Sequence, residues 1–304
     1  YDHLVIATGA KTNYFGNENI AKYAMPMKSL SESLDLRSYI LRQFENALNE
    51  NDQEEKDSMM NFVIVGGGPT GVELAGALSE LKTHILPKDF PDLDIRRMQI
   101  HVIEAGQKLL GGMSEKAAQN AFDYLKEMDI NVWLDTRVND YDGEVVDTNQ
   151  VTIPSKNLIW AAGVQGSIPT GISEAQCFRG RIKVNELTQV DGLENVYAIG
   201  DVAYMKTELF PNGLPMLGSV AQQQGTYLSK HLIRLAKKME VSSFEYSDKG
   251  TMATVGRNRA VVDLGRFQFG GFFAWLTWLF VHLMLLVDFR NLIKIENFQK
   301  FDKN

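Results

Sequence analysis

The sequence predicts an α/β fold in which parallel strands alternate with helices. In residues 62–76 a buried strand, a glycine turn and a helix that begins at about Pro69 follow one another. The strand 100–104 then closes a strand–helix–strand unit. A third observation is that the strands 4–9 and 158–163 both end in glycine, which suggests two related domains. A coincidence between two buried strands is the alternative to that last reading.

The glycine turn has the spacing of a dinucleotide-binding motif. Gly66, Gly68 and Gly71 follow the pattern G-x-G-x-x-G. In this pattern the first glycine permits a tight turn, the second lets a pyrophosphate approach the backbone, and the third lets the helix pack close to the strand. The helix N-terminus offers unpaired N–H groups to the phosphates. Glu104 ends the next strand, where it could accept hydrogen bonds from a ribose diol. We therefore predict a Rossmann-like dinucleotide-binding domain, with a purely structural unit as the alternative.

Length, charge and cysteine content limit the classes of function. A chain of 304 residues predicts about two domains. The net charge of −7 argues against general nucleic-acid binding. The single cysteine, Cys177, excludes an internal disulfide and a multi-cysteine metal site, and the five histidines show no metal-ligand spacing, so we expect no metal. The chain begins at Tyr1 with a strand and without a signal peptide, so we expect a fragment whose N-terminal part is absent.

Upstream of the glycine turn, the pattern predicts a loop, a helix and a polar connection. Residues 11–28 are expected to form a loop, and the acidic residues 50–57 a solvated connection. Between them, Ser29 and Glu32 form a possible capping box at the start of an amphipathic helix. The apolar residues of this helix at helical spacing are Leu30, Leu34, Leu41, Phe44 and Leu48.

Downstream of the turn, helices alternate with short strands. The residues expected to face inward from the first helix are Val72, Leu74, Ala75, Leu78 and Leu81. Further helices are predicted over 114–128 and 218–238. The predicted inward residues of these helices are Ala117, Ala121, Phe122, Leu125 and Met128, then Val220, Tyr227, Leu228, Leu232 and Leu235. Short strands are expected at 130–134, 145–146, 151–153, 180–184 and 196–201. Asp142-Gly143 predicts a hairpin turn.

Two acidic residues are candidates for chemistry. Glu73 follows the glycine turn, where a carboxylate could touch a nicotinamide or a second substrate, or could simply favour the positive end of the helix dipole. Asp201 follows Gly200 at the end of a strand. An acid in that position can hold a sugar or ribityl hydroxyl, or can hydrogen-bond its own backbone in a turn. For Glu73 and for Asp201, the sequence leaves both the functional and the structural role open.

Three glutamines occupy the first turns of the helix 218–238. They are Gln222, Gln223 and Gln224. A run of this kind can form a solvated helix face, but a helix start is also a good binding site for a ring that bears carbonyl groups.

The C-terminal stretch 271–287 is apolar apart from Thr277 and His282. Its 17 residues would span roughly 25 Å as a helix, which is less than the ~30 Å hydrocarbon core of a membrane. We therefore expect burial against a partner or shallow insertion into one leaflet, with a core or dimer helix as the alternative. Residues 288–304 hold four basic and three acidic residues, so the attraction to anionic lipids would be weak.

These segments together resemble the type II (alternative, non-proton-pumping) NADH:quinone oxidoreductases. The resemblance rests on residues 1–9, 63–76, 158–163 and 196–201, and on the tail 274–282 with Phe289-Arg-Asn291. These flavoproteins belong to the pyridine nucleotide-disulfide oxidoreductase-like superfamily. The fold implied has two Rossmann-like domains, the first incomplete in this chain, and a C-terminal apolar helical segment for membrane association. The implied domains are 1–58 and 164–249 (FAD-binding domain and linker helix), 59–163 (NADH-binding domain) and 250–304 (membrane association or dimer contact).

The resemblance also implies cofactors and site residues. NADH passes a hydride to FAD, and the reduced flavin passes electrons to a membrane quinone of a respiratory chain. The residues implied to bind the two cofactors are Thr8, Gly9, Gly66, Gly68, Pro69, Thr70, Gly71, Glu104, Ala162, Gly163, Gly200, Asp201 and Gln224. The residues implied in catalysis or quinone contact are Glu73, Gln222 and Gln223. An acid at position 104 implies a preference for NADH over NADPH.

The chain departs from the family pattern in two places. Gly218-Ser219 stands where relatives carry an Ala-Gln pair near the quinone. The first glycine motif of the family, which holds the FAD pyrophosphate, would precede Tyr1. The implied location is peripheral, on the cytoplasmic face of the inner membrane, with a possible homodimer.

Two other classes of function remain open at this stage. One is a different FAD- and NAD(P)H-dependent reductase, of the ferredoxin or rubredoxin type; a dithiol reductase would need a cysteine pair that the sequence lacks. The other is a non-catalytic nucleotide-binding module.

Overall fold

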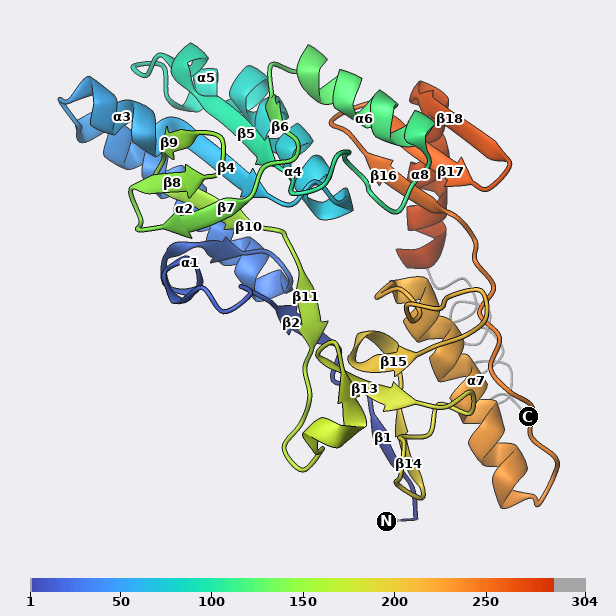
Figure 1. Ribbon diagram of the computed structural model, residues 1–304. Helices are drawn as coiled ribbons and strands as arrows, with labels where there is room; N and C mark the ends of the chain where they lie inside the picture. The colour runs from blue at the N-terminus through green and yellow to red at the C-terminus, as the bar shows by residue number, and fades with distance from the viewer. Residues whose placement is uncertain (1, 287–304) are drawn as a thin grey trace, which may run out of the picture. The chain divides into compact units, whose positions relative to one another are not determined.

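The computed structural model describes residues 2–286 and divides them into two compact units. Unit 1 comprises residues 2–16 and 163–249, and unit 2 comprises residues 17–162 and 250–286. Both are α/β structures, as the sequence predicts (Figure 1).

Unit 2 is built on a five-stranded parallel sheet (Figure 1). Its strands, in spatial order, are β3 (Met25–Pro26), β10 (Asn157–Trp160), β4 (Asn61–Val65), β5 (Gln99–Ile103) and β6 (Asn131–Trp133). The central strands β4 and β10 are apolar nearly throughout, as expected for parallel strands that are covered on both faces.

Three helices contribute to the core on one face of this sheet. They are α2 (Leu30–Asn49), α4 (Pro69–Glu80) and α6 (Glu115–Glu127). Phe62 and Ile64 of β4 share a core cluster with Phe44 of α2, Val72 of α4 and Leu125 of α6. The other helical pieces are α1 (Glu18–Tyr23), α3 (Gln53–Met60), a π-helix (Leu81–Ile85), α5 (Leu86–Asp89) and a 3-10 turn (Ile95–Arg97).

Two connections expected to be irregular contain regular structure. Residues 11–28 contain α1 and β3. Helix α1 begins at Glu18, because the side chain of Asn17 caps it by accepting a hydrogen bond from the backbone N–H of Ile20. Within 50–57, Asp52 caps α3 in the same way. Of the acidic residues of this segment, Asp57 is paired with Arg97.

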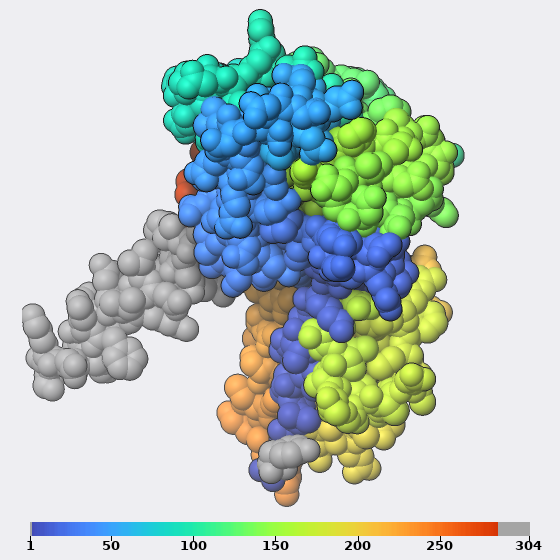
Figure 2. Space-filling view, turned by 90° about the vertical axis from the view of Figure 1, so that its left-hand side faces the viewer, coloured from blue at the N-terminus to red at the C-terminus, as the bar shows by residue number. Residues whose placement is uncertain are grey.

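Helix α2 forms where predicted but buries a different face. The capping box of Ser29 and Glu32 is present. The buried residues are Leu36, Ile40, Gln43, Phe44 and Ala47, whereas Leu30, Leu34, Leu41 and Leu48 are exposed. Of the predicted core residues only Phe44 is correct. Figure 2 faces the part of the surface that α2 and α3 form (blue).

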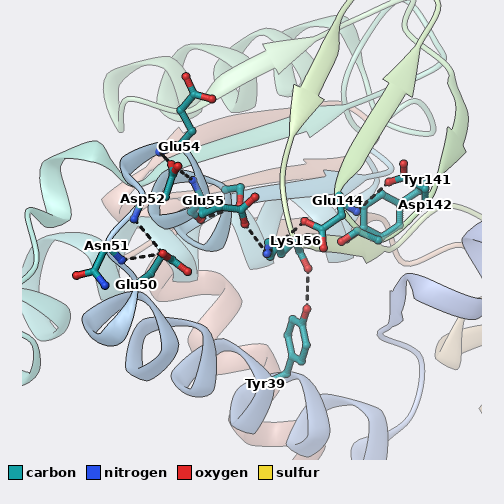
Figure 3. Close-up of polar contacts among 12 residues, drawn as sticks. Tyr39, Glu50, Asn51, Asp52, Glu54, Glu55, Tyr141, Asp142, Glu144 and Lys156 are labelled. Atoms are coloured by element: carbon teal, nitrogen blue, oxygen red, sulfur yellow. Dashed lines mark hydrogen bonds and ion pairs between the residues drawn. The ribbon is translucent and has the colours of Figure 1, made fainter.

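A polar cluster ties α2 and α3 to a three-stranded antiparallel sheet. That sheet consists of β7 (Val138–Tyr141), β8 (Val145–Thr148) and β9 (Thr152–Pro154), and Asp142-Gly143 forms the predicted hairpin turn. Lys156, just after β9, pairs with Glu55 at 2.6 Å and with Glu144 at 3.2 Å (Figure 3). The hydroxyl of Tyr39 in α2 donates to the carbonyl oxygen of Lys156 at 2.6 Å.

The C-terminal part of unit 2 adds a small sheet that sequence reasoning missed. Its antiparallel strands are β16 (Thr251–Thr254), β17 (Ala260–Leu264) and β18 (Phe267–Gly271), followed by α8 (Phe272–Leu286). Strand β16 contacts α4, and β17 contacts both α6 and α8. The predicted apolar stretch is thus helical as far as residue 286, and position 287 and the tail 288–304 lie outside the described residues. Among the described helices, none combines the length and apolar character that crossing a membrane requires.

Unit 1 contains short strands and one long helix. The strand pairs are β1 (Leu4–Ile6) with β14 (Val196–Ala198), in parallel, and β2 (Ala10–Thr12) with β11 (Val164–Gly166), antiparallel. A further sheet has β12 (Cys177–Phe178), β13 (Arg181–Val184) and β15 (Ala203–Met205), beside 3-10 turns at Glu174–Gln176 and Gly200–Val202. Helix α7 (Gly218–Ala236) buries Val220 and Leu228, but the predicted core residue Leu235 is exposed.

The compact units group the chain differently from the expected domains. The helix α2 belongs to the same unit as residues 59–162, because its buried side chains pack on that sheet. The segment 250–286 also belongs there, because β16 and β17 pack on α4 and α6. The boundaries after residues 162 and 249 lie close to the expected ones at 163 and 249.

Candidate functional site

The glycine turn joins β4 to α4 with the close contacts that its spacing predicts. A Cβ atom on Gly71 would lie 1.9 Å from the carbonyl oxygen of Gly66, so only glycine lets the helix start this close to the strand. Gly66 has a φ of +111°, and a Cβ there would lie 2.9 Å from Ala162 Cα. Gly68 differs, because a Cβ there would meet nothing within 4 Å. The turn therefore leaves open space at the glycine predicted to face a pyrophosphate.

The N-terminus of α4 is available to an anion. Gly68 is its N-cap and offers no side-chain hydrogen bond to the helix. Pro69 occupies the first helical position, and Pro69 and Thr70 are exposed. An uncapped helix start with exposed backbone N–H groups and a positive dipole end is a common phosphate site.

Glu104 lies beside the glycine turn, at the end of the neighbouring strand β5. Its two carboxylate oxygens accept separate hydrogen bonds, one from the N–H of Gly67 and one from the N–H of Gly106, each at 2.7 Å. The side chain is partly exposed. Glu104 therefore lies next to the glycine turn, and the backbone N–H groups of Gly67 and Gly106 hold its carboxylate in place.

Glu73 lies in the second turn of α4 and is half-buried. Its Oε1 accepts from the backbone N–H of Thr254 at 3.3 Å and from Thr254 Oγ1 at 3.4 Å. Burial raises the pKa of Glu73 above its usual range, while the hydrogen bonds from Thr254 and the electrostatic influence of His282 act in the opposite direction. Thr254 is a contact that sequence reasoning did not find, because no local motif marks it.

Unit 1 holds a second group of the predicted residues. Thr8 donates from Oγ1 to the carbonyl oxygen of Ser167, and Ser167 donates its N–H to the carbonyl oxygen of Gly9. Gly163 lies in the same unit, with a φ of +77°, and a Cβ there would lie 2.5 Å from the ring of Phe15. The ends of β1 and the segment after residue 163 are thus held together.

Gly200 and Asp201 lie at the end of β14, in a 3-10 turn against α7. The buried side chain of Gln224 accepts the N–H of Gly200 through Oε1 at 2.7 Å. Asp201 is partly buried and interacts electrostatically with Arg181, a buried guanidinium that sequence reasoning also missed. Gln224 therefore fixes the turn that presents Asp201.

The other two glutamines have different surroundings. Gln223 uses both ends of its amide, donating to the carbonyl oxygen of Ser247 and accepting its N–H, each at 3.0 Å. Gln222 is exposed. Ser219, at the position of the family's Ala-Gln pair, contacts the hydroxyl of Tyr246 at 3.2 Å. Among the described residues, no cluster of three or more potential ligands could hold a metal ion.

Comparisons with known proteins show the family of the chain. The family model for pyridine nucleotide-disulphide oxidoreductases matches residues 1–225. The chain belongs to this family. The model for the NDH2 C-terminal domain matches residues 249–295.

Individual relatives point to one branch of the family. The type II NADH:quinone oxidoreductase Ndh of Mycobacterium tuberculosis is 35% identical over 306 residues, covering 96% of this chain and 65% of the relative. The type II NADH:quinone oxidoreductase of Haemophilus influenzae is 30% identical, covering 87% of this chain and 62% of the relative. The predicted resemblance to type II NADH:quinone oxidoreductases is confirmed, and the chain spans just under two thirds of the length of these relatives.

The fold has a close counterpart among solved structures. The structure of NDH2 from Plasmodium falciparum in complex with NADH superimposes with a TM-score of 0.84, at 24% identity, over 94% of this chain and 74% of that one. The α/β fold with Rossmann-like domains is therefore confirmed.

Proposed function

We propose that this chain provides the NADH site and part of the FAD site of a type II NADH:quinone oxidoreductase. The observation that carries the proposal is the glycine turn with open space at Gly68, next to Glu104, in a chain 35% identical over 306 residues to such an enzyme.

The residues of unit 2 fit NADH. Gly68 admits the pyrophosphate, and the backbone N–H groups of Thr70 and Gly71 at the helix start supply donors for it. Glu104 accepts the ribose hydroxyls and repels a 2′-phosphate, which favours NADH over NADPH. Ala162 packs closely against Gly66 of the turn.

The residues of unit 1 fit part of a flavin site. Thr8, Gly9 and Gly163 hold two segments together by hydrogen bonds, and the partly buried Asp201 offers an acceptor for a ribityl hydroxyl. A flavin held there would supply the redox chemistry between NADH and a quinone. Gln224 acts on this site through Gly200.

Glu73 and the glutamines are proposed for proton and quinone chemistry. A half-buried carboxylate whose pKa is raised by burial can hold and release a proton. Gln222 is exposed, whereas the amide of the half-buried Gln223 already binds Ser247. We therefore assign quinone contact to Gln222 ahead of Gln223.

Helix α8 is proposed as the contact with the membrane surface. One side of it packs on β17 through Ala274, Trp275 and Trp278. Its outward side exposes Phe273 at 75% and Phe280 at 64%. An exposed apolar face of this kind fits insertion into one leaflet, and a homodimer through the same face is the competing arrangement. We also propose a peripheral location on the cytoplasmic face of the inner membrane, and the resemblance to type II NADH:quinone oxidoreductases supports it.

The test is the visible spectrum of the purified chain after incubation with FAD and desalting, followed by anaerobic addition of NADH. Retained flavin that bleaches on NADH addition is the expected result. A chain that stays colourless while NADH binds would reduce the proposal to a nucleotide-binding module. A flavin that is retained but not reduced by NADH would contradict the assigned direction of hydride transfer.

A further inference from the structure

The small C-terminal sheet makes direct contact with the helix of the NADH site. Strand β16 contacts α4, and the fit is close: a Cβ on Gly76 of α4 would lie 2.3 Å from the backbone N of Gly256, in the turn after β16. In the same region Thr254 donates its backbone N–H and its Oγ1–H to Glu73 Oε1. The two residues are 181 positions apart in sequence.

These two donors oppose the effect of burial on Glu73. Removal from water disfavours a charged carboxylate, and hydrogen bonds to the charged form favour it. His282 of α8 also exerts an electrostatic influence on Glu73, and its Nδ1 lies 2.9 Å from the carbonyl oxygen of Trp278.

The charged groups on the packed elements have other partners. Glu80 of α4 accepts the N–H of Arg257, and Arg259 pairs with Glu127 of α6. Asp263 of β17 accepts the N–H of Ser114. Thr254 is therefore the principal polar contact of the Glu73 carboxylate within the described residues of unit 2.

We propose that Thr254 is a positioning residue that holds the Glu73 carboxylate in one orientation behind the glycine turn and favours its ionised form. The C-terminal sheet is then part of the nucleotide site and not only a link to α8. The inference rests on the proposed function in one respect, namely that Glu73 has a task in the reaction. The orientation itself stands on the two hydrogen bonds.

Holding this side chain matters because a glutamate has several free rotamers. A polar group that acts on a bound cofactor must be kept within a small distance and angle of its productive position, and hydrogen bonds from a neighbouring element do this. A backbone donor is well suited to the task, because its own position is fixed by the sheet.

The experiment compares Thr254→Val, which keeps the shape and the backbone N–H but removes the hydroxyl, with Thr254→Ser, which keeps both donors. The Glu73 carboxyl is followed by ¹³C NMR over pH in the full chain labelled at glutamate, and Glu73→Gln assigns the signal. We expect Thr254→Val to move the Glu73 transition to higher pH and Thr254→Ser to restore it. An unchanged transition in a cooperatively folded Thr254→Val protein would overturn the proposal.

A second readout uses the unmodified protein, so the test does not depend on the variant folding. The amide ¹H shift of Thr254 is expected to follow the ionisation of Glu73, because the N–H bond to oxygen strengthens when the carboxyl carries charge. A Thr254 amide that does not respond while Glu73 titrates would also overturn the proposal.

Measurement of kcat tests the role of Glu73 in the reaction separately from its positioning by Thr254. In the flavin-loaded protein, Thr254→Val is expected to lower kcat by about threefold to tenfold, the equivalent of one hydrogen bond, with little change in KM for NADH. If the NMR transition shifts but kcat does not, the positioning holds and the role of Glu73 in catalysis fails. If neither changes, the positioning itself is wrong.

Discussion

The indole Nε1–H of Trp133 donates a hydrogen bond to Nδ1 of His101 at 3.2 Å, between the neighbouring strands β6 and β5. His101 is only 6% exposed, and its Nε2 has no partner among the described residues. Because Nδ1 accepts this bond, the proton of the neutral imidazole is assigned to Nε2. Burial lowers the pKa of His101 to about 4.

His101 should make the stability of the chain depend on pH. The unfolded chain has an ordinary imidazole with a pKa of 6.5, so between pH 6.5 and about 4 the unfolded state binds more protons than the folded state. The contribution is therefore fully present above pH 6.5 and is lost as the pH falls towards 4, at up to about 1.4 kcal/mol per pH unit. Urea unfolding of the wild type and of His101→Phe at several pH values measures it. Equal slopes for the two proteins across this range would contradict it.

Gly71→Ala and Gly68→Ala form a matched pair in the glycine turn. The methyl group at position 71 would lie 1.9 Å from the carbonyl oxygen of Gly66, so we expect a loss of about 3 kcal/mol or more of folding free energy. The methyl group at position 68 meets nothing within 4 Å, so we expect little change in Tm but weaker NADH binding. Thermal unfolding and NADH titration of both variants provide the test. Normal NADH affinity in Gly68→Ala would argue that the open space does not receive the pyrophosphate.

Glu104→Gln should weaken both the turn and the nucleotide site. The NH2 group that replaces one carboxylate oxygen cannot accept a hydrogen bond, so either the N–H of Gly67 or that of Gly106 loses its acceptor. The neutral side chain also no longer repels a 2′-phosphate. We expect the affinity for NADH to fall by about tenfold, while the ratio of NADH to NADPH affinity falls as well. Fluorescence titration with each nucleotide measures both effects. An unchanged ratio would mean that Glu104 does not face the ribose.

Tyr39→Phe should cost about 1 kcal/mol of stability, because the carbonyl oxygen of Lys156 loses its hydrogen bond. The control is Lys156→Met, which removes the pairs with Glu55 and Glu144. Those carboxylates are 48% and 60% exposed, so that loss should stay below about 1 kcal/mol. Denaturant unfolding distinguishes the two. A larger loss for Lys156→Met would show that the ion pairs, and not the partly buried hydrogen bond of Tyr39, join α2 to this region.

Replacing Phe273 and Phe280 together by serine should reduce binding to lipid vesicles. Each exposed phenylalanine that enters the lipid contributes about 1.5 to 3 kcal/mol, so the loss of both should lower the partition coefficient by about a hundredfold or more. Phe178→Ser, at an exposed phenylalanine of unit 1, is the matched control. Vesicle co-sedimentation measures the partition. If binding persists but the oligomer dissociates, the outward face of α8 is a dimer contact.

Local signals were sufficient for the elements that carry the nucleotide motif. The glycine spacing, the capping box of Ser29 and Glu32, and the turn at Asp142-Gly143 each depend on residues within a few positions of one another. Such features depend on backbone conformation and on hydrogen bonds between residues that are close in sequence, so the sequence alone predicts them.

Periodicity did not decide which face of α2 is buried. The helix carries two apolar stripes, one at Leu34, Leu41 and Leu48 and one at Leu36 and Ile40, and both have helical spacing. Only the position of the sheet, against which Leu36 and Ile40 pack, selects between them. The strands β16–β18 were missed for a related reason, since they are short and are stabilised by α4, α6 and α8.

The sequence by itself determined the α/β class, the order of the strands and helices around the glycine turn, and the family. The tertiary structure decided which side chains meet across long separations, above all Thr254 with Glu73 and Trp133 with His101. Hydrogen bonds of this kind join residues from different elements, and their partners are chosen by how those elements pack. Packing depends on many weak contacts that are shared over the whole unit, and no local pattern of residues encodes it.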